Sequence, residues 1–374
     1  MILDLVLLAV SFVSDSRALL AQGEQPEGAA TPTARTETHT WKKLATESYR
    51  GKQDDLCFLD ARHGFYVNGA GKIFETKDGG ATFALRLEQK GTYFRCIAFV
   101  DEQRGFAGNI GLDYFPGVTD ATPLYGTTDG GATWKPVPMG EKPVKGLCAL
   151  EVVRVPFVNA GKLDEKAVIV GGGRVGGPAV FVRSDDLGAT WKRTELAQLA
   201  GMVLDVHFFD RQHGVIAAAS NTEVQDSHAR ILRTEDGGET WVQAWEGPRA
   251  FELTWKLSFP TRDVGYCTIQ SYDPDPKRTQ RFIAKTVDGG KTWSELPLVD
   301  DAKVREFGVA FVDANTGWVG AMGGGFETRD GGATWARCEL GNAVNKLRIV
   351  RDGEGWVGYA LGVELWKLEL TGKR

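Results

Sequence analysis

One eight-residue motif recurs six times along this chain and constrains its fold more than any other feature. It reads T-x-D-G-G-x-T-W, with small departures at single positions. The copies are TKDGGATF from Thr76, TTDGGATW from Thr127, SDDLGATW from Ser184, TEDGGETW from Thr234, TVDGGKTW from Thr286 and TRDGGATW from Thr328. Their central aspartates lie 42 to 57 residues apart, which is the period of a four-stranded propeller blade. We therefore expect each copy to mark one blade.

A second, weaker pattern precedes the motif: an aromatic or aliphatic residue, usually an acid two places later, and then Gly with an apolar run. The copies are FLDARHGFYV from Phe58, FVDEQRGFAG from Phe99, FFDRQHGVIA from Phe208, FPTRDVGYCT from Phe259, FVDANTGWVG from Phe311 and IVRDGEGWVG from Ile349, with a degenerate copy over 157–170. Seven copies predict seven blades.

The two ends of the repeat region complement each other. The last copy is followed by VELWKLEL and lacks the eight-residue motif, whereas Thr40-Trp41-Lys42-Lys43 resembles a final strand without its turn. We expect residues 40–46 to supply the outer strand of the last blade, which would close the ring and remove exposed sheet edges. The predicted fold is all-β, a single seven-bladed β-propeller of four-stranded blades over residues 40–370.

Within the motif every residue has a structural task. Asp-Gly-Gly suits a tight hairpin turn, the Thr hydroxyls and the Asp carboxylate can bond the turn's own amides, and Trp can pack between blades. Equivalent turns lie far apart around a ring, so we interpret the six aspartates as structural rather than as a shared metal or catalytic site. They are Asp78, Asp129, Asp186, Asp236, Asp288 and Asp330.

Composition excludes several functional classes. The net charge is -5 and no basic block resembles a nucleic-acid footprint, so no nucleic-acid partner is expected. The 5 cysteines show no C-x-x-C spacing and no neighbouring histidine, which favours buried free thiols over a zinc site, a redox pair or a disulfide framework. No metal and no cofactor are predicted.

The first residues favour export. Residues 1–13, MILDLVLLAVSFV, form an apolar run too short to span a bilayer, and Ser16-Arg17-Ala18 resembles a cleavage site, so residues 1–21 resemble a signal peptide. No Lys or Arg precedes the run and Asp4 interrupts it, which leaves a cytoplasmic protein as the alternative. The polar segment 22–39 has no periodicity and is expected to be a flexible linker.

The eight-residue motif resembles the Asp box, or BNR repeat, of sialidases, xyloglucanases, sortilin-type receptors and the photosystem II assembly and stability factor family. The last family resembles the chain best, because it pairs the two patterns as in FVDANTGWVGAMGGGFETRDGGATW from Phe311 to Trp335. The likeness covers residues 40–370. It implies a seven-bladed propeller that binds a polypeptide through an arginine-bearing surface, with no individual residue matched to that surface.

Sialidases and other glycan-binding or glycan-hydrolysing propellers are the alternative. The sialidase resemblance would require three convergent arginines, an R-I-P segment and a tyrosine nucleophile polarised by a glutamate, and no R-I-P occurs here. Sialidases resemble six-bladed rings, and xyloglucanases pair two propellers in about twice this length. We therefore expect no enzymatic activity.

Two surfaces are candidate binding sites. Blades 2 to 5 carry long central loops, over 108–123, 171–178, 220–229 and 270–280, on the face away from the Asp-box turns, and loops on a rigid scaffold are common carriers of recognition. Their candidate residues are Tyr114, Phe115, Arg174, Tyr272 and Arg278, and the loops also contain His228. The alternative is that these loops are solvated decoration.

The second surface is the mouth of the central channel, where the innermost strands begin. Five cations fall just before or early in those strands: Arg50, Arg95, Lys256, Arg305 and Arg348. They can gather as a positive patch, although isolated arginines more often form ordinary salt bridges. Together the patterns predict a non-catalytic, exported, monomeric scaffold that binds a protein or peptide, and the family resemblance implies that it assists assembly of a membrane or envelope complex.

Overall fold

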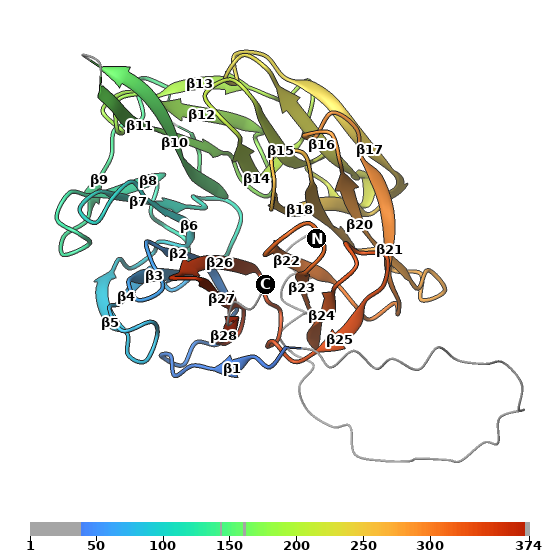
Figure 1. Ribbon diagram of the computed structural model, residues 1–374. Coiled ribbons are helices and arrows are strands. Elements are labelled where there is room, and N and C mark those ends of the chain that lie inside the picture. Colours follow the sequence, from blue (N-terminus) through green and yellow to red (C-terminus); the bar gives the residue numbers. More distant parts are fainter. Residues whose placement is uncertain (1–38, 143, 160–161, 371–374) are drawn as a thin grey trace, which may run out of the picture.

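The computed structural model describes residues 39–142, 144–159 and 162–370. Residues 1–38, on which the predictions of a signal peptide and most of the linker fall, lie outside the described residues. Seven four-stranded antiparallel sheets surround one axis as the blades of a β-propeller, as predicted (Figure 1). Among the described residues no helix is long and apolar enough to cross a membrane.

Each blade is a meander of consecutive strands. Blade 1 consists of β2 (Gln53–Phe58), β3 (Gly64–Asn68), β4 (Lys72–Thr76) and β5 (Ala84–Glu88). Blade 2 consists of β6 (Phe94–Phe99), β7 (Gly105–Asn109), β8 (Leu124–Thr127) and β9 (Lys135–Pro136). Blade 3 consists of β10 (Ala149–Asn159), β11 (Lys162–Gly172), β12 (Val180–Ser184) and β13 (Lys192–Glu195). Blade 4 consists of β14 (Met202–Phe208), β15 (Gly214–Ala219), β16 (His228–Thr234) and β17 (Val242–Ala250). Blade 5 consists of β18 (Glu252–Ser258), β19 (Gly265–Ser271), β20 (Gln280–Thr286) and β21 (Ser294–Asp300). Blade 6 consists of β22 (Glu306–Phe311), β23 (Gly317–Ala321), β24 (Gly324–Thr328) and β25 (Ala336–Cys338). A short 3-10 helix, η1 (Val224–Asp226), lies in the loop between β15 and β16.

Blade 7 joins the two ends of the described chain. It consists of β26 (Lys346–Asp352), β27 (Gly355–Leu361), β28 (Leu365–Leu370) and β1 (Lys42–Lys43). The outer strand β1 pairs with β28 through Lys42 opposite Lys367 and Lys43 opposite Trp366. The predicted closure of the ring by residues 40–46 is confirmed.

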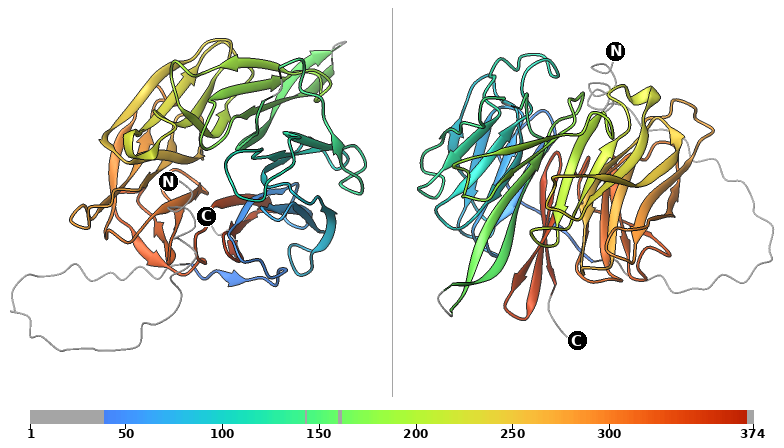
Figure 2. Two further views of the ribbon diagram at one scale, coloured as in Figure 1. Left: turned by 180° about the vertical axis from the view of Figure 1, so that it is seen from behind. Right: turned by 90° about the horizontal axis from the view of Figure 1, so that it is seen from above.

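The inner strands contact one another around the whole ring. β2 touches β6, and the same contact repeats from blade to blade until β22 touches β26 and β26 returns to β2. The views from behind and from above show the resulting annulus (Figure 2), from which the hairpin β10–β11 projects. The degenerate copy expected over 157–170 belongs to this hairpin, but its first strand begins upstream, at Ala149.

The core lies between blades rather than inside one centre. Seven of the eight buried hydrophobic clusters of the described chain each combine residues of two neighbouring blades, and the eighth lies at one mouth of the channel. Trp134 of blade 2, for example, lies in one cluster with Phe65 of blade 1 and Phe99 of blade 2. The rings of Phe65 and Phe99 are stacked with their centroids 4.1 Å apart. The tryptophan of the motif thus packs between blades.

The glycine of the second pattern has a steric reason. The Phe58 ring lies across Gly64, where an added Cβ would come within 2.4 Å of the ring, and Phe311 lies across Gly317 at the same 2.4 Å. Only glycine leaves room for the ring, which then reaches the next blade: Phe58 stacks on Tyr359 at 3.7 Å. The spacing of aromatic residue and glycine therefore encodes how adjacent blades pack.

Each Asp-box turn is held by its own side chains. In the first copy Thr76 Oγ1 donates to Asp78 Oδ1 at 2.8 Å and accepts from the Gly80 amide at 2.8 Å, while the Thr82 amide and hydroxyl donate to Asp78 at 2.9 and 2.6 Å. Gly79 and Gly80 have φ angles of 71° and 90°, which glycine adopts without strain. The Thr82 hydrogen bonds lower the pKa of Asp78 to about 2.

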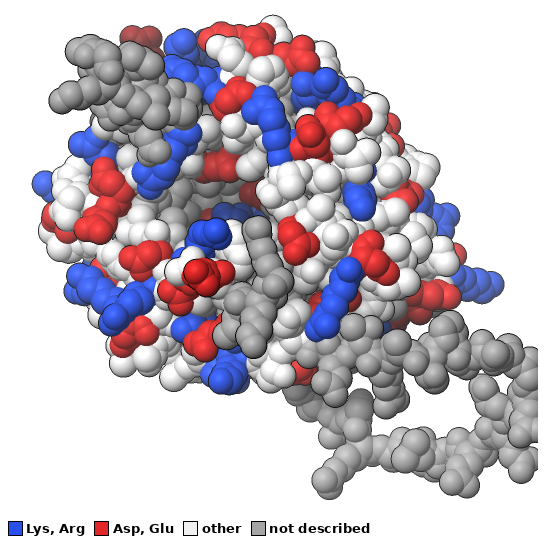
Figure 3. All heavy atoms as spheres, viewed as in Figure 1, with Lys and Arg blue, Asp and Glu red and all other residues white. Residues whose placement is uncertain are grey.

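Acidic and basic side chains are mixed over the face shown in Figure 3 rather than sorted into one large block, and this face is hollowed at the centre of the ring. The ring thus provides a rigid frame around an axial channel, and its loops are positioned at the ends of that channel.

Candidate functional site

A cavity of about 740 Å³ opens at the channel mouth on the face away from the Asp-box turns. The residues that line it come from all seven blades. Every blade contributes the loop between its second and third strands, and blades 1, 2, 5, 6 and 7 also contribute residues just before or within the inner strand. The four long loops predicted from the sequence all contribute, through Ile110 and Tyr114 to Val118, Val175, Val224 and Tyr272. The two surfaces proposed from the sequence are therefore one site.

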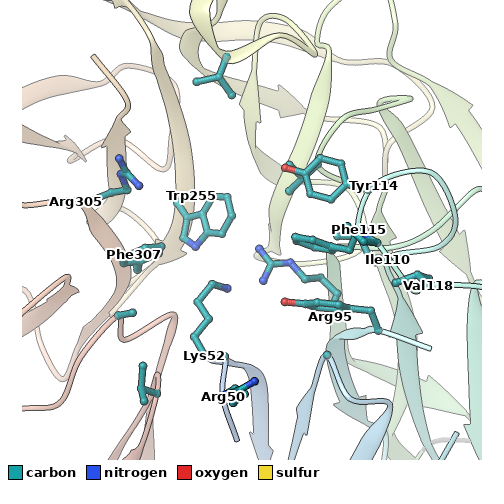
Figure 4. A pocket seen from close by; sticks show the side chains of 18 of the residues that line it. Arg50, Lys52, Arg95, Ile110, Tyr114, Phe115, Val118, Trp255, Arg305 and Phe307 are labelled. Atoms are coloured by element: carbon teal, nitrogen blue, oxygen red, sulfur yellow. The ribbon is translucent and has the colours of Figure 1, made fainter. Parts of the chain in front are cut away.

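Aromatic and aliphatic side chains form most of the walls. Phe115 stacks on Tyr93 with ring centroids 4.5 Å apart, and Tyr114 meets Phe115 edge-on at 4.7 Å. On the opposite wall Trp255 meets Phe307 edge-on at 6.3 Å. Figure 4 shows these two walls facing each other across the cavity. Such a concave apolar surface can hold a bulky apolar group.

The floor of the cavity holds a buried ion cluster. Asp54 has a fully buried side chain and accepts a hydrogen bond from Lys52 Nζ at 3.0 Å. Arg95 Nη1 donates to the same Asp54 oxygen, and its guanidinium lies 5.0 Å from the Trp255 ring. The second carboxylate oxygen of Asp54 is buried without a hydrogen-bond partner. In Figure 4 Lys52 and Arg95 both point into the space between the walls.

A second ion cluster continues the charge down the channel. Asp205 Oδ1 lies 3.4 Å from Lys346 Nζ and 3.6 Å from Lys256 Nζ, and Lys346 Nζ lies 3.7 Å from Asp55. Burial opposes ionisation of Asp205, but Lys256 and Lys346 lower its pKa to about 2. Together the two clusters hold four cations and three carboxylates, so these clusters carry a positive excess although the chain is net negative.

Two further cations lie at the rim. The Arg305 guanidinium stacks 4.2 Å from the Tyr272 ring, and its Nε is buried without a hydrogen-bond partner. Arg50 is exposed and also lines the cavity. Neither has a carboxylate within salt-bridge distance among the described residues. Both are therefore available to an acidic ligand.

The structure brings together six of the ten binding residues proposed from the sequence. Those that line the cavity are Arg50, Arg95, Arg305, Tyr114, Phe115 and Tyr272. The other four do not line it. Lys256 is buried and donates to the Leu204 carbonyl at 3.0 Å, and Arg348 is half-buried on β26.

Arg174 and Arg278 differ from each other. Arg174 is 4% exposed, and its Nε and Nη1 are buried without a hydrogen-bond partner next to the cavity wall. Arg278 is 58% exposed and pairs with Asp273 at 3.0 Å, outside the cavity. His228, the other residue singled out on the long loops, has its Nδ1 2.9 Å from the Gly247 carbonyl oxygen. The fold of each loop decides which cations reach the cavity.

Sequence reasoning missed Lys52, Asp54, Trp255 and Phe307. All four lie just before or within inner strands, and two of them are close to residues that were chosen: Trp255 directly precedes Lys256, and Phe307 follows Arg305 by two places. The register of β18 shifts between Thr254 and Leu257, so simple alternation along the strand does not tell which side chain faces the cavity. The signal that could have found them is their position near the starts of inner strands, next to residues that had already been chosen.

The six Asp-box carboxylates lie elsewhere. Each accepts hydrogen bonds from the Thr or Ser residues of its own turn, as Asp288 does from Thr286 and Thr292 at 2.8 and 2.6 Å. Among the residues that the structure describes, no group of three or more His, Cys, Asp or Glu side chains is placed to hold a metal ion. All 5 cysteines are free thiols, four of them buried and Cys57 half-buried.

The described lining of the cavity carries no carboxylate. Hydrolysis of a glycosidic bond needs two carboxyl groups flanking the bond. No Asp or Glu is among the described residues that line the cavity, and Asp54 below them is committed to Lys52 and Arg95. The arrangement can bind an apolar group beside an anionic one, by burial in the walls and by charge at the rim.

Comparison with known proteins gives the fold. No family model matches the sequence, and no curated protein is significantly similar to it. A solved structure of YCF48 bound to D1 peptide is 19% identical, with a TM-score of 0.61, over 91% of this chain and 97% of that one. YCF48 from Cyanidioschyzon merolae is 17% identical, with a TM-score of 0.60, over 88% of this chain and 98% of that one.

Glycoside hydrolase propellers are also similar in structure. The GH74 xyloglucanase from Xanthomonas campestris is 14% identical, with a TM-score of 0.57, over 88% of this chain but 53% of that one. The Niastella koreensis GH74 enzyme is 16% identical, with a TM-score of 0.56, over 85% of this chain and 52% of that one. These identities are low, so the similarities describe a shared ring and not a shared activity.

Proposed function

We propose that this chain is a non-catalytic scaffold that binds a segment of a partner protein at the central cavity. A bulky apolar side chain of the partner enters between the Phe115 and Trp255 walls, and an acidic group of the partner meets Arg50 and Arg305 at the rim. The single observation that carries this proposal is an apolar cavity of about 740 Å³ with two unpaired cations at its mouth.

Two further points support a peptide ligand. All seven blades contribute to the cavity, and a pocket built on such a rigid frame loses little entropy on binding. A YCF48 ring of similar shape has been solved with D1 peptide. We propose by the same reasoning that the partner belongs to a membrane or envelope complex whose assembly the scaffold assists.

Binding of synthetic peptides tests the site. The probes are eight-residue peptides with Phe, Leu or Ser at one central position and either Asp or Lys beside it. We expect Phe and Leu peptides with Asp to bind, and Ser or Lys peptides to bind more weakly by about ten-fold or more, because both burial and charge are lost. Fluorescence anisotropy on the full chain measures the affinities.

Matched variants separate the site from the rest of the surface. Arg305→Glu should weaken binding of the Asp peptides by about ten-fold, whereas Arg278→Glu, which changes an exposed arginine outside the cavity, should leave it unchanged. Val118→Trp should obstruct the cavity and abolish binding, whereas Val242→Trp, at an exposed position on β17, should not. If the cavity variant and its control in either pair changed the affinity equally, the proposed site would be contradicted.

Glycan binding is a second candidate, because Arg50, Arg95 and Arg305 line one cavity and sialidase-like sites gather three arginines. Fluorogenic sialosides and xyloglucan fragments test it directly. We expect no turnover, since no carboxylate lines the cavity among the described residues. Turnover that a cavity variant abolishes would replace the scaffold proposal with an enzymatic one.

We also propose that the scaffold acts outside the cytoplasm. The support is the apolar run of residues 1–13 followed by a small-residue segment. Fractionation of cells, followed by mass spectrometry of the intact protein in each fraction, tests this location. A mature chain that begins near residue 22 in the periplasmic or secreted fraction is the expected result, and a cytoplasmic chain that retains Met1 would contradict it.

A further inference from the structure

Lys52 occupies an unusual position for a lysine in this chain. It lies one residue before β2 and lines the cavity with a side chain that is only 21% exposed. Its ammonium group is held between the Asp54 carboxylate at 3.0 Å and the Trp255 ring at 5.9 Å. Figure 4 shows it pointing into the space between Trp255 and Arg95. Any ligand that fills the cavity therefore approaches this amine.

Several charges surround the Lys52 amine. The Arg95 guanidinium lies 5.0 Å and the Lys256 ammonium 5.8 Å from the same Trp255 ring, and Arg95 shares with Lys52 a single oxygen of Asp54. The titratable and charged groups that act on this site are Asp54, Arg95, Lys256, Tyr49 and Tyr93. A lysine that is buried beside other cations gives up its proton more readily than one in water.

From this geometry we propose that Lys52 is a nucleophilic lysine that forms a reversible imine with an apolar aldehyde bound in the cavity. The lysine nitrogen attacks the carbonyl carbon, a carbon–nitrogen bond forms, and the carbonyl oxygen leaves as water. The ammonium form of the lysine and the aldehyde thus give a protonated imine and one water molecule, with no oxidant or reductant. The inference goes beyond the binding of a peptide and does not depend on it.

The surrounding residues suit each stage of this reaction. The unpartnered oxygen of Asp54 can take the proton that the ammonium group must lose and return it to the hydroxyl group of the carbinolamine, which then leaves as water. The carboxylate that is restored in this way is the counter-ion of the protonated imine. The Trp255 face stabilises a cation at this place. Phe115 and Phe307 offer apolar surface to the aldehyde's hydrocarbon part.

Electrostatics agree with the geometry. Burial, with the neighbouring Arg95, lowers the pKa of Lys52 to about 8. A free amine is the form that attacks a carbonyl, so a larger share of Lys52 than of an exposed lysine is reactive near neutral pH. The cavity volume of about 740 Å³ falls in the range of about 300–1,000 Å³ that small-molecule sites occupy.

Reductive trapping tests the proposal on the full chain. The protein is incubated with decanal and sodium cyanoborohydride over a range of pH, and modified lysines are located by peptide mapping. We expect Lys52 to be modified at least about ten-fold faster than the exposed Lys77 and Lys192, with a pH midpoint near 8. Glyceraldehyde, which is polar, should not show this preference.

Two lysines provide internal comparison. Lys256 also flanks Trp255 but does not line the cavity, so it should stay unmodified in the folded chain. Lys52→Arg should abolish the fast adduct. The proposal is overturned if decanal modifies Lys52 no faster than Lys77, or if glyceraldehyde labels Lys52 as well as decanal does. Both measurements use the unaltered protein, so they do not require the variant to fold, and neither outcome bears on peptide affinity.

Discussion

The contribution of a single buried residue to the stability of this fold can depend on pH. Glu306, the first residue of β22, is fully buried, and both of its carboxyl oxygens lack a hydrogen-bond partner. Its neighbours Glu252 and Arg281 contribute opposite charges. Burial raises the pKa of Glu306 to about 8, so the folded chain keeps a proton on this side chain that an unfolded chain loses above its ordinary pKa of 4.5.

The sign of the effect on stability follows from the protons bound. Between pH 4.5 and about 8 the folded state binds more protons than the unfolded state. The contribution of Glu306 to the free energy of unfolding is therefore greatest below pH 4.5, and it is lost as the pH rises from 4.5 through about 8. Glu306→Gln should therefore become more stable than the unaltered protein by on the order of 4 kcal/mol above pH 8. Urea unfolding at pH 5, 7 and 9 measures the difference.

An exposed glutamate serves as control. Glu239 is 67% exposed and 3.4 Å from Lys192, so Glu239→Gln should shift stability little at any of the three pH values. If Glu306→Gln gave the same small shift at every pH, Glu306 would be ionised in the folded chain and the assignment of its pKa would be wrong.

At the scale of elements, the Asp-box turn is the unit that repeats. Its hydrogen bonds lie within eight residues, so each turn forms from local sequence and joins the third and fourth strands of a blade. The third copy departs from the pattern at Leu187, which replaces the first glycine and adopts a φ of 60°. A side chain in this left-handed region costs about 1 kcal/mol or more relative to glycine.

Two substitutions in the turns should act in opposite directions. Asp288→Ala removes the acceptor of the Thr286 and Thr292 hydroxyls and should destabilise the fold by about 1 kcal/mol or more, with unchanged affinity for the peptide probes. Leu187→Gly should stabilise it by about 1 kcal/mol. Chemical denaturation measures both, and loss of peptide binding in Asp288→Ala without loss of stability would contradict the structural role.

The recurrence of these local units is why the fold could be predicted from the sequence. Seven blades and four strands in each follow from motifs whose contacts are near in sequence, and the closing strand near Trp41 follows from the incomplete copies at the two ends of the repeat region, although its partner β28 is distant in sequence. The site follows less well because it depends on seven loop folds and on inner-strand register. A bulge in β18 decides how Trp255 and Lys256 face the channel, and no local pattern announces it.

At the scale of the whole molecule, the ring depends on one seam. Trp41 is 4% exposed and meets Trp318 of blade 6 edge-on at 5.7 Å, while β1 beside it completes blade 7. The Leu44 amide donates to the Leu365 carbonyl at 2.8 Å. These contacts tie two neighbouring blades to the first described strand, so the seam shares its stability with the rest of the ring.

Trp41→Ala should therefore destabilise the protein by about 3–5 kcal/mol, because it empties a large buried site. It should also expose the edge of β28 and promote association of chains. Urea unfolding and size-exclusion chromatography measure the two effects. Lys42→Ala, at an exposed neighbouring position, should change neither, and equal behaviour of the two variants would show that the seam contributes nothing.

Because β1 precedes every other described strand and β28 follows them, the seam joins the first and the last of the described strands to leave the ribosome. Blades 1 to 6 can each form as they emerge, yet blade 7 stays incomplete, and its edge unprotected, until translation has passed Leu370. A nonsense codon or a proteolytic cut anywhere in the final strand would thus leave an open ring for cellular quality control to remove.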